Sequence, residues 1–143
     1  MYGLVLLIHS WLRWAVVAAG LFAVVRGGTR EGAAGKWFTL VLDIQILLGL
    51  LLYFVLSPFT RNALSDFGAA MGSSQLRFWA VEHVFGMIIG TALAHIGRAR
   101  VRKAAPERRA RIAAIFYGLA LLAILASIPW PGMPAGRPLF RLE

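Results

Sequence analysis

The chain contains no cysteine, so disulfide bonds, thiolate-bound metals and a cysteine nucleophile are all excluded. Charged residues are also scarce: they make up 15% of the sequence, where an ordinary soluble domain has about a quarter. Only six residues are acidic, which disfavours a zinc or two-metal centre built from carboxylates. Phosphate-binding glycine motifs are absent, and Ser10 and Ser127 lack the histidine and acid that a hydrolase nucleophile needs.

Apolar residues dominate the composition of the chain. They account for 59% of the 143 residues, and the mean hydropathy is +0.73. A single small core in water would not bury so much apolar surface, so we expect lipid to cover it. Four apolar runs approach the roughly 20 residues that cross a bilayer. They cover residues 4–25, 37–56, 78–96 and 112–128.

A segment inside the hydrocarbon must satisfy its own backbone hydrogen bonds, so each run is predicted to be a helix. The sequence therefore predicts an all-α protein, an integral membrane four-helix bundle with up-down-up-down topology. It forms a single transmembrane domain over residues 1–143, and this multi-pass fold has the lipid bilayer as its first partner. We interpret the first run as a retained helix, because it lacks the basic start and the cleavage motif of a signal peptide.

The formal net charge of +9 is distributed around the apolar runs, which favours lipid headgroups over nucleic acid as the partner of the basic residues. Two links carry most of them: Arg26, Arg30 and Lys36 in one, and Arg98, Arg100, Arg102, Lys103, Arg108, Arg109 and Arg111 in the other. The opposite side has Arg61, Arg77, Arg137 and Arg141. The positive-inside rule places both links in the cytoplasm and both termini outside. An outer aromatic belt would then contain Trp11, Trp14, Trp79 and Trp130, with Trp37 at the inner surface.

The outer loop from Ser57 to Gln75 is moderately apolar. Phe59, Leu64, Phe67 and Met71 have spacings that fit a short amphipathic helix, lying on the membrane or covering a site between helices. A plain surface loop is the other interpretation.

All three histidines lie within predicted spans, where polar groups are costly and suggest function. His9 and His83 each follow the start of a span by about five residues, on two spans that run in the same direction. With about 1.5 Å of rise per residue, both imidazoles lie at nearly the same depth below the outer surface. Two histidines at one level on two helices of a bundle are a recurrent way to hold the iron of a haem.

The neighbours of His83 on its own helical face are small or flexible, and they include Gly86, Met87 and Gly90. Small residues there would let a flat macrocycle lie close to the backbone. The alternative is that these glycines serve close packing between helices. For the anionic propionates of a haem, Arg13 is the best placed cation, followed by Arg77 and Arg137; Arg13 could instead pair with Glu82 or lie among the tryptophans.

His95 lies twelve residues after His83, which is roughly 18 Å deeper along the helix. The chain has no second histidine at that level. Asp43 and Gln45 start the second span at a similar inner depth, so Asp43 is predicted to accept a proton from His95 as a structural pair. A quinone or proton site and a haem with a weaker second ligand are the alternatives for His95.

Several motifs in the chain resemble a bacterial family of small four-helix membrane proteins commonly labelled "cytochrome B". They are His9-Ser-Trp-Leu-Arg-Trp14, Phe78-Trp-Ala-Val-Glu-His83, Ala94-His-Ile-Gly-Arg98, Ile128-Pro-Trp-Pro131 and Arg137-Pro-Leu-Phe-Arg141. The resemblance covers nearly the whole chain and implies non-covalent haem b in a bacterial inner membrane. Two-haem cytochromes of this kind use four histidines, whereas this chain has three, so it resembles a version with one complete site.

Three functions follow from these observations. The leading hypothesis is a b-type cytochrome that carries one haem, or two, and transfers electrons, with a quinone as a candidate further cofactor. Such a protein would act as a subunit of a larger redox complex rather than as an enzyme on its own, and it could also form a homo-oligomer. The alternatives are a cofactor-free structural or assembly subunit, and a small proton or solute transporter that uses His95, Asp43 and Glu82.

Overall fold

The structure is a computed structural model, and it describes residues 1–29 and 32–142. The predicted cytoplasmic cation Arg30 lies outside the described residues. Throughout the described part the regular structure is helical, and no strand occurs there. The predicted all-α class is confirmed, and four helices are long and apolar enough to cross a membrane.

The first two spans are α1 (Tyr2–Arg26) and α2 (Ala33–Leu51), and a π-helical turn, η1 (Leu52–Leu56), continues α2. The third is α6 (His83–Lys103), preceded by a second π-helical turn, η2 (Phe78–Glu82), and the fourth is α7 (Pro106–Ala126). Three of these helices continue into charged sequence beyond the predicted ends of the spans. Hydropathy marks the part of a helix inside lipid, whereas helical hydrogen bonds also persist in water.

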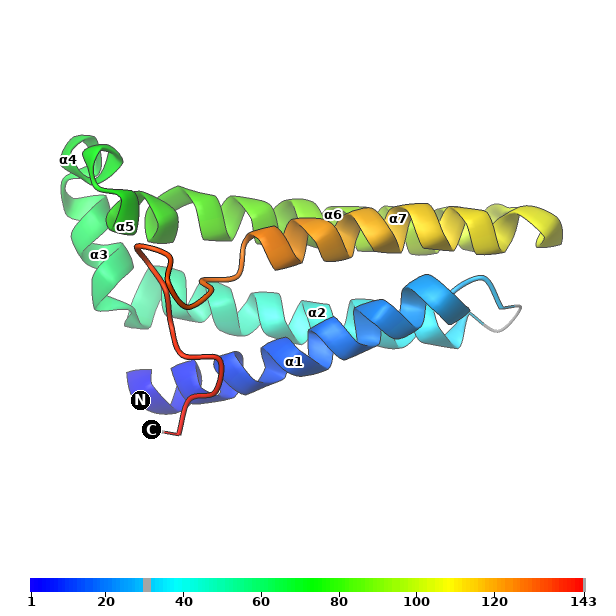
Figure 1. Cartoon of the computed structure of the whole chain (residues 1–143), viewed down its shortest axis with the longest axis horizontal. Helices are drawn as coiled ribbons and strands as arrows, with labels where there is room; N and C mark the ends of the chain where they lie inside the picture. The colour runs from blue at the N-terminus through cyan, green and yellow to red at the C-terminus, as the bar shows by residue number, and fades with distance from the viewer. Residues whose placement is uncertain (30–31, 143) are drawn as a thin grey trace.

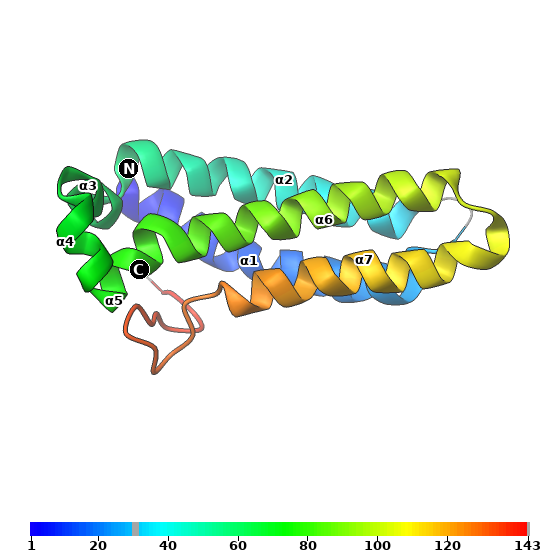
Figure 2. The same cartoon turned by 90° about the horizontal axis from the view of Figure 1, so that it is seen from above.

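Figure 1 shows α1 and α2 as one pair of long helices and α6 and α7 as the other. Both termini lie at one end of the bundle, and the two basic links lie at the opposite end (Figure 1). Helix α1 packs against α2 and α7, and α6 packs against the same two helices. Helices α1 and α6 are therefore diagonal neighbours across the bundle (Figure 2).

The buried core lies between the four long helices. Its largest fully buried side chains include Phe38 and Leu42 of α2 and Tyr117 and Ile124 of α7. Many large apolar side chains on the outside remain exposed, as is expected where lipid rather than water surrounds a bundle. Close helix contacts depend on small residues: a Cβ atom on Gly20 would lie 3.0 Å from Leu121 and 3.1 Å from Phe38.

The segment between the second and third spans, which the sequence predicts to be an outer loop, forms three short helices rather than one amphipathic helix or a plain loop. They are α3 (Pro58–Ser65), α4 (Phe67–Gly72) and α5 (Ser74–Arg77). Each begins at a polar side chain that accepts from a backbone N–H, namely Ser57, Asp66 and Ser73. These caps interrupt the apolar pattern, and so divide the segment. The helices lie together at the end of the bundle that carries the termini (Figure 1).

The segment after α7 crosses the same end of the bundle and reaches α1. Trp11 and Arg13 donate to the carbonyl groups of Arg141 and Leu139 over 2.8 and 2.6 Å. Trp14 also donates to Leu139, over 3.1 Å, and its ring lies 5.6 Å from that of Phe140. The C-terminal segment is thus attached to the start of the first span, beside the level of His9.

Candidate functional site

His9 of α1 and His83 of α6 meet on the axis of the bundle. Their ring centroids are 6.3 Å apart, and the ring planes are at 74° to one another. This contact is possible because the two helices are diagonal neighbours, so each ring projects into the space between α2 and α7. The structure therefore brings together the two histidines that the sequence places at one depth.

A main-chain carbonyl group fixes the ring of His83. Its Nδ1 lies 2.7 Å from the oxygen of Ser127, the residue at which α7 ends. In a continuous helix that carbonyl would accept from the residue four positions later, but that residue is Pro131, which has no N–H. The histidine thus satisfies an otherwise free helix-terminal carbonyl with Nδ1, which leaves Nε2 available on the other side of the ring.

The ring of His9 is held from α2. The Gln45 side-chain nitrogen donates to the main-chain oxygen of His9 over 3.0 Å and lies 3.3 Å from its Nε2. Gly49, one turn along α2, gives the ring room, because a Cβ atom there would lie 3.2 Å from Cε1 of His9. Gln45 and Asp43 lie at a similar depth on α2, as predicted, but Gln45 faces His9 whereas Asp43 faces His95. Two residues are about 200° apart on a helix, so the two side chains point to opposite sides of α2.

A cavity of about 110 Å³ lies beside the two rings and is lined mainly by apolar side chains of all four long helices. Its polar walls include His9, Arg13, Gln45, Trp79, His83 and Arg137. Four buried polar side-chain atoms have no hydrogen-bond partner among the described residues: Nδ1 of His9, Nε of Arg13, Oε1 of Gln45 and Nε1 of Trp79. All four belong to residues that line this one cavity.

Unpartnered buried polar atoms are unfavourable, by about 1–3 kcal/mol each, and are uncommon in folded proteins. Their concentration around one cavity in a chain this small indicates a site prepared for a ligand with polar groups. Sequence reasoning missed Trp79 as part of it, because a tryptophan near a membrane surface is typical of an aromatic belt.

The predicted arginines separate into two groups. Arg13 lines the cavity and also stacks over Trp14 at 5.1 Å, and Arg137 lies over Phe59 and Trp79 at 4.7 and 5.3 Å. Arg77 does not line the cavity.

Arg77 forms a 2.7 Å ion pair with Glu82 and donates to the carbonyl of Met71. The alternative in which Arg13 pairs with Glu82 is therefore wrong, because Arg77, five residues earlier on the same chain segment, takes that carboxylate. Of the predicted cations, Arg13 and Arg137 are the two that the structure brings to the site.

Gly86 and Gly90 face α7. A Cβ atom on Gly86 would collide with the Ser127 hydroxyl, and one on Gly90 would lie 2.7 Å from Ile124. Neither glycine lines the cavity, whereas Val84 and Met87 do. These contacts favour close helix packing, the alternative given for these glycines, over room for a macrocycle.

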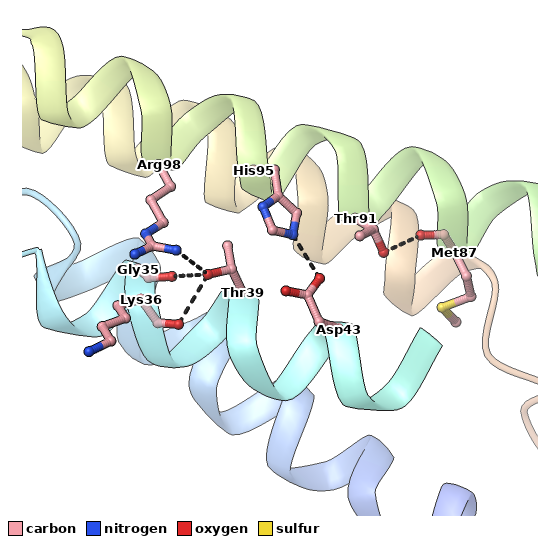
Figure 3. Close-up of polar contacts among 8 residues, drawn as sticks. All are labelled: Gly35, Lys36, Thr39, Asp43, Met87, Thr91, His95 and Arg98. Atoms are coloured by element: carbon pink, nitrogen blue, oxygen red, sulfur yellow. Dashed lines mark hydrogen bonds and ion pairs between the residues drawn. The ribbon is translucent and has the colours of Figure 1, made fainter. Parts of the chain in front are cut away.

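His95 lies away from this site. Its Nε2 is 2.7 Å from Oδ1 of Asp43, the pair expected from the sequence (Figure 3). The two side chains are 45% and 43% exposed, so the pair faces the outside of the bundle between α2 and α6 rather than the axis. Thr39 and Arg98 follow towards the end of the bundle that carries the basic links, and a 3.3 Å hydrogen bond joins them (Figure 3).

Comparison with known protein families, with curated proteins and with solved structures found no match. The chemistry of the site therefore has to be argued from its residues. No group of three or more histidine, cysteine or acidic side chains is close enough to bind a metal ion in the described part of the chain. The two facing imidazoles suit a metal whose other ligands come from a cofactor.

Proposed function

We propose that this chain is a membrane b-type cytochrome that holds one haem between His9 and His83. The observation that carries the proposal is the pair of rings at 6.3 Å on the axis of the bundle. A metal bound by one nitrogen of each of two opposed imidazoles, at about 2 Å, holds their centroids roughly 6 Å apart. The separation between the rings would therefore suit one iron held by both imidazoles.

The surroundings of the two rings support the same assignment. The carbonyl of Ser127 engages Nδ1 of His83, which directs Nε2 away from α7; such partners orient metal-ligating histidines in general. His9 has a buried nitrogen, Nδ1, without a hydrogen-bond partner among the described residues.

The remaining polar groups of the cavity have roles that suit an amphipathic cofactor. Arg13 and Arg137 supply positive charge near the end of the bundle that carries the termini, where they would bind carboxylate groups. The apolar walls would limit the access of water, which tunes the redox potential of a metal bound there. A bound b-type haem supplies one-electron transfer at its iron.

We also propose the orientation and the setting. The two basic links would face the cytoplasm of a bacterial cell, so the haem would lie near the outer face of its inner membrane. A single one-electron centre needs both a donor and an acceptor, so the chain would work as a subunit of a larger redox complex. The four-helix arrangement and the segregated arginines support this proposal.

The test is an optical spectrum of the full chain, purified in detergent after expression with haem available, before and after dithionite. We expect a sharp Soret band and, on reduction, resolved α and β bands of a low-spin haem. His9→Ala and His83→Ala should each abolish these bands. His95→Ala is the matched control, because it removes the third histidine outside the cavity, and it should retain them.

Retention of an unchanged low-spin spectrum in either the His9 or the His83 variant would refute the assignment. A featureless spectrum of the folded wild-type chain, together with a negative pyridine haemochrome assay, would do the same. That second result would instead favour a cofactor-free structural subunit.

A further inference from the structure

A second cavity lies at the opposite end of the bundle, where the basic links are. Its volume is about 290 Å³, and α2, α6 and α7 contribute most of its walls. Four of its side chains are cationic, namely Lys36, Arg98, Arg102 and Arg109, and Thr29 and Tyr117 add hydroxyl groups. No described residue that lines it is acidic.

Among the described residues, no acidic side chain pairs with these cations. The ion pairs found among the described residues, Arg77–Glu82 and His95–Asp43, lie elsewhere. Arg98 uses one nitrogen on Thr39 and Arg109 one on the carbonyl of Ala104, and each guanidinium has five N–H groups.

Lys36 and Arg102 make no side-chain hydrogen bond within the described part of the chain. Figure 3 shows Lys36 and Arg98 at the same end of the α2–α6 pair, one from each helix. Like charges gathered at one cavity repel each other, and a bound anion would offset that repulsion.

Tyr117 adds a hydroxyl group to the wall of this cavity. The residue is 1% exposed, and its ring packs edge-on against Phe38 at 5.8 Å. The hydroxyl reaches Gly35 of α2, where a Cβ atom would collide with it, and the residue lines the cavity. The hydroxyl makes no hydrogen bond among the described residues and is not one of the fully buried polar atoms, so it is accessible from the cavity.

The start of α2 adds to the positive potential. Its first residue, Ala33, follows Gly32, which lines the cavity and offers no side chain to cap the helix. The first N–H groups of a helix have no partner within it and favour anions.

We propose that this cavity binds a phosphate group. The ligand chemistry is shared by the headgroup of an anionic phospholipid and by a soluble phosphate. The position favours the lipid, since Trp37, a residue type enriched at membrane surfaces, follows Lys36 and is exposed. Basic pockets between transmembrane helices on the cytoplasmic side are a known setting for phospholipid headgroups. The proposal is independent of haem.

The test uses the full chain in detergent and native mass spectrometry. The probes are phosphatidylglycerol, phosphatidylcholine as the neutral-headgroup comparison, and inorganic phosphate. The double variant Lys36→Gln/Arg102→Gln should weaken phosphatidylglycerol binding at least about ten-fold, as expected for lost charge-assisted hydrogen bonds. Tyr117→Phe, which removes one hydroxyl, should weaken it by a few-fold.

The matched control is Lys103→Gln/Arg108→Gln, which removes the same charges from exposed positions that do not line the cavity. It should bind phosphatidylglycerol like the wild type. If inorganic phosphate displaces phosphatidylglycerol, the site accepts a phosphate group from either a lipid or a soluble ligand. If phosphatidylglycerol binds and inorganic phosphate does not displace it, the site is specific for the lipid. Equal losses in both double variants, or no preference for phosphatidylglycerol over phosphatidylcholine, would overturn the proposal. Circular dichroism of each variant verifies that it is folded.

Discussion

His83 of α6 contacts the main-chain oxygen of Ser127 at the end of α7, with 2.7 Å between Nδ1 and that oxygen. The contact depends on the two prolines that follow. Pro129 and Pro131 lack the N–H groups that would bind the carbonyls of residues 125 and 127 in a continuing helix. The Trp130 indole takes the first carbonyl, at 2.8 Å, and His83 takes the second.

This arrangement gives a first prediction, which rests on the proposed haem. In Pro129→Ala/Pro131→Ala, α7 can extend and use the carbonyl of Ser127 itself, so His83 loses its orienting partner. We expect haem affinity to fall by about 10- to 100-fold, the usual effect of losing such a partner. Titration of the apoprotein with haemin measures it. Pro134→Ala is the control, and equal affinity in the double variant would contradict the role of the carbonyl.

A second prediction concerns the contact between α6 and α7. Gly86→Ala places a Cβ atom against the Ser127 hydroxyl and should lower the free energy of unfolding by about 1–3 kcal/mol. Gly118→Ala is the matched control, because no atom lies within 4 Å of its added Cβ and alanine favours helix. Unfolding in mixed micelles with increasing dodecyl sulfate gives both values. A Gly86 variant as stable as the control would show that these helices are not packed as closely as described.

The pair of His95 and Asp43 gives a third prediction. Both side chains are partly exposed to lipid, where an isolated ionisable group is costly. His95→Ala and Asp43→Ala should each destabilise the chain, and the double variant should lose less than their sum. We expect a coupling free energy of about 0.6–1.7 kcal/mol, the range found for hydrogen bonds between membrane helices. The same unfolding assay provides the double-mutant cycle, and additive losses would mean that the pair contributes nothing.

The attachment of the C-terminal segment gives a fourth prediction. Trp11→Phe removes the indole N–H that donates to the carbonyl of Arg141. Trp14→Phe removes one of the donors to the carbonyl of Leu139, and both variants keep an aromatic ring. A lost hydrogen bond of about 1 kcal/mol corresponds to roughly five-fold faster opening of the segment. Amide hydrogen exchange of residues 139–142 measures this. Trp37→Phe, at the other end of the bundle, should leave that exchange unchanged, and equal rates in all variants would refute the attachment.

Much of this protein could be predicted from the sequence because the relevant forces act locally. Four apolar runs of sufficient length must become helices in lipid, and the structure has them. The common depth of His9 and His83 follows from helical rise alone. The pairing of His95 with Asp43 also follows from depth, since few polar groups are present at that level to satisfy either one.

The tertiary structure alone decided how each helix is rotated about its axis. Hydropathy is nearly uniform around these helices, so the sequence does not tell that Gln45 faces His9, or that Gly86 and Gly90 face α7 instead of a cofactor. Rotation is determined by which small residues allow two backbones to approach. The same packing placed α1 and α6 on a diagonal and gathered Lys36, Arg98 and Arg102 around one cavity. Depth in the membrane was a property of the sequence, whereas the direction in which each side chain points was a property of the assembled bundle.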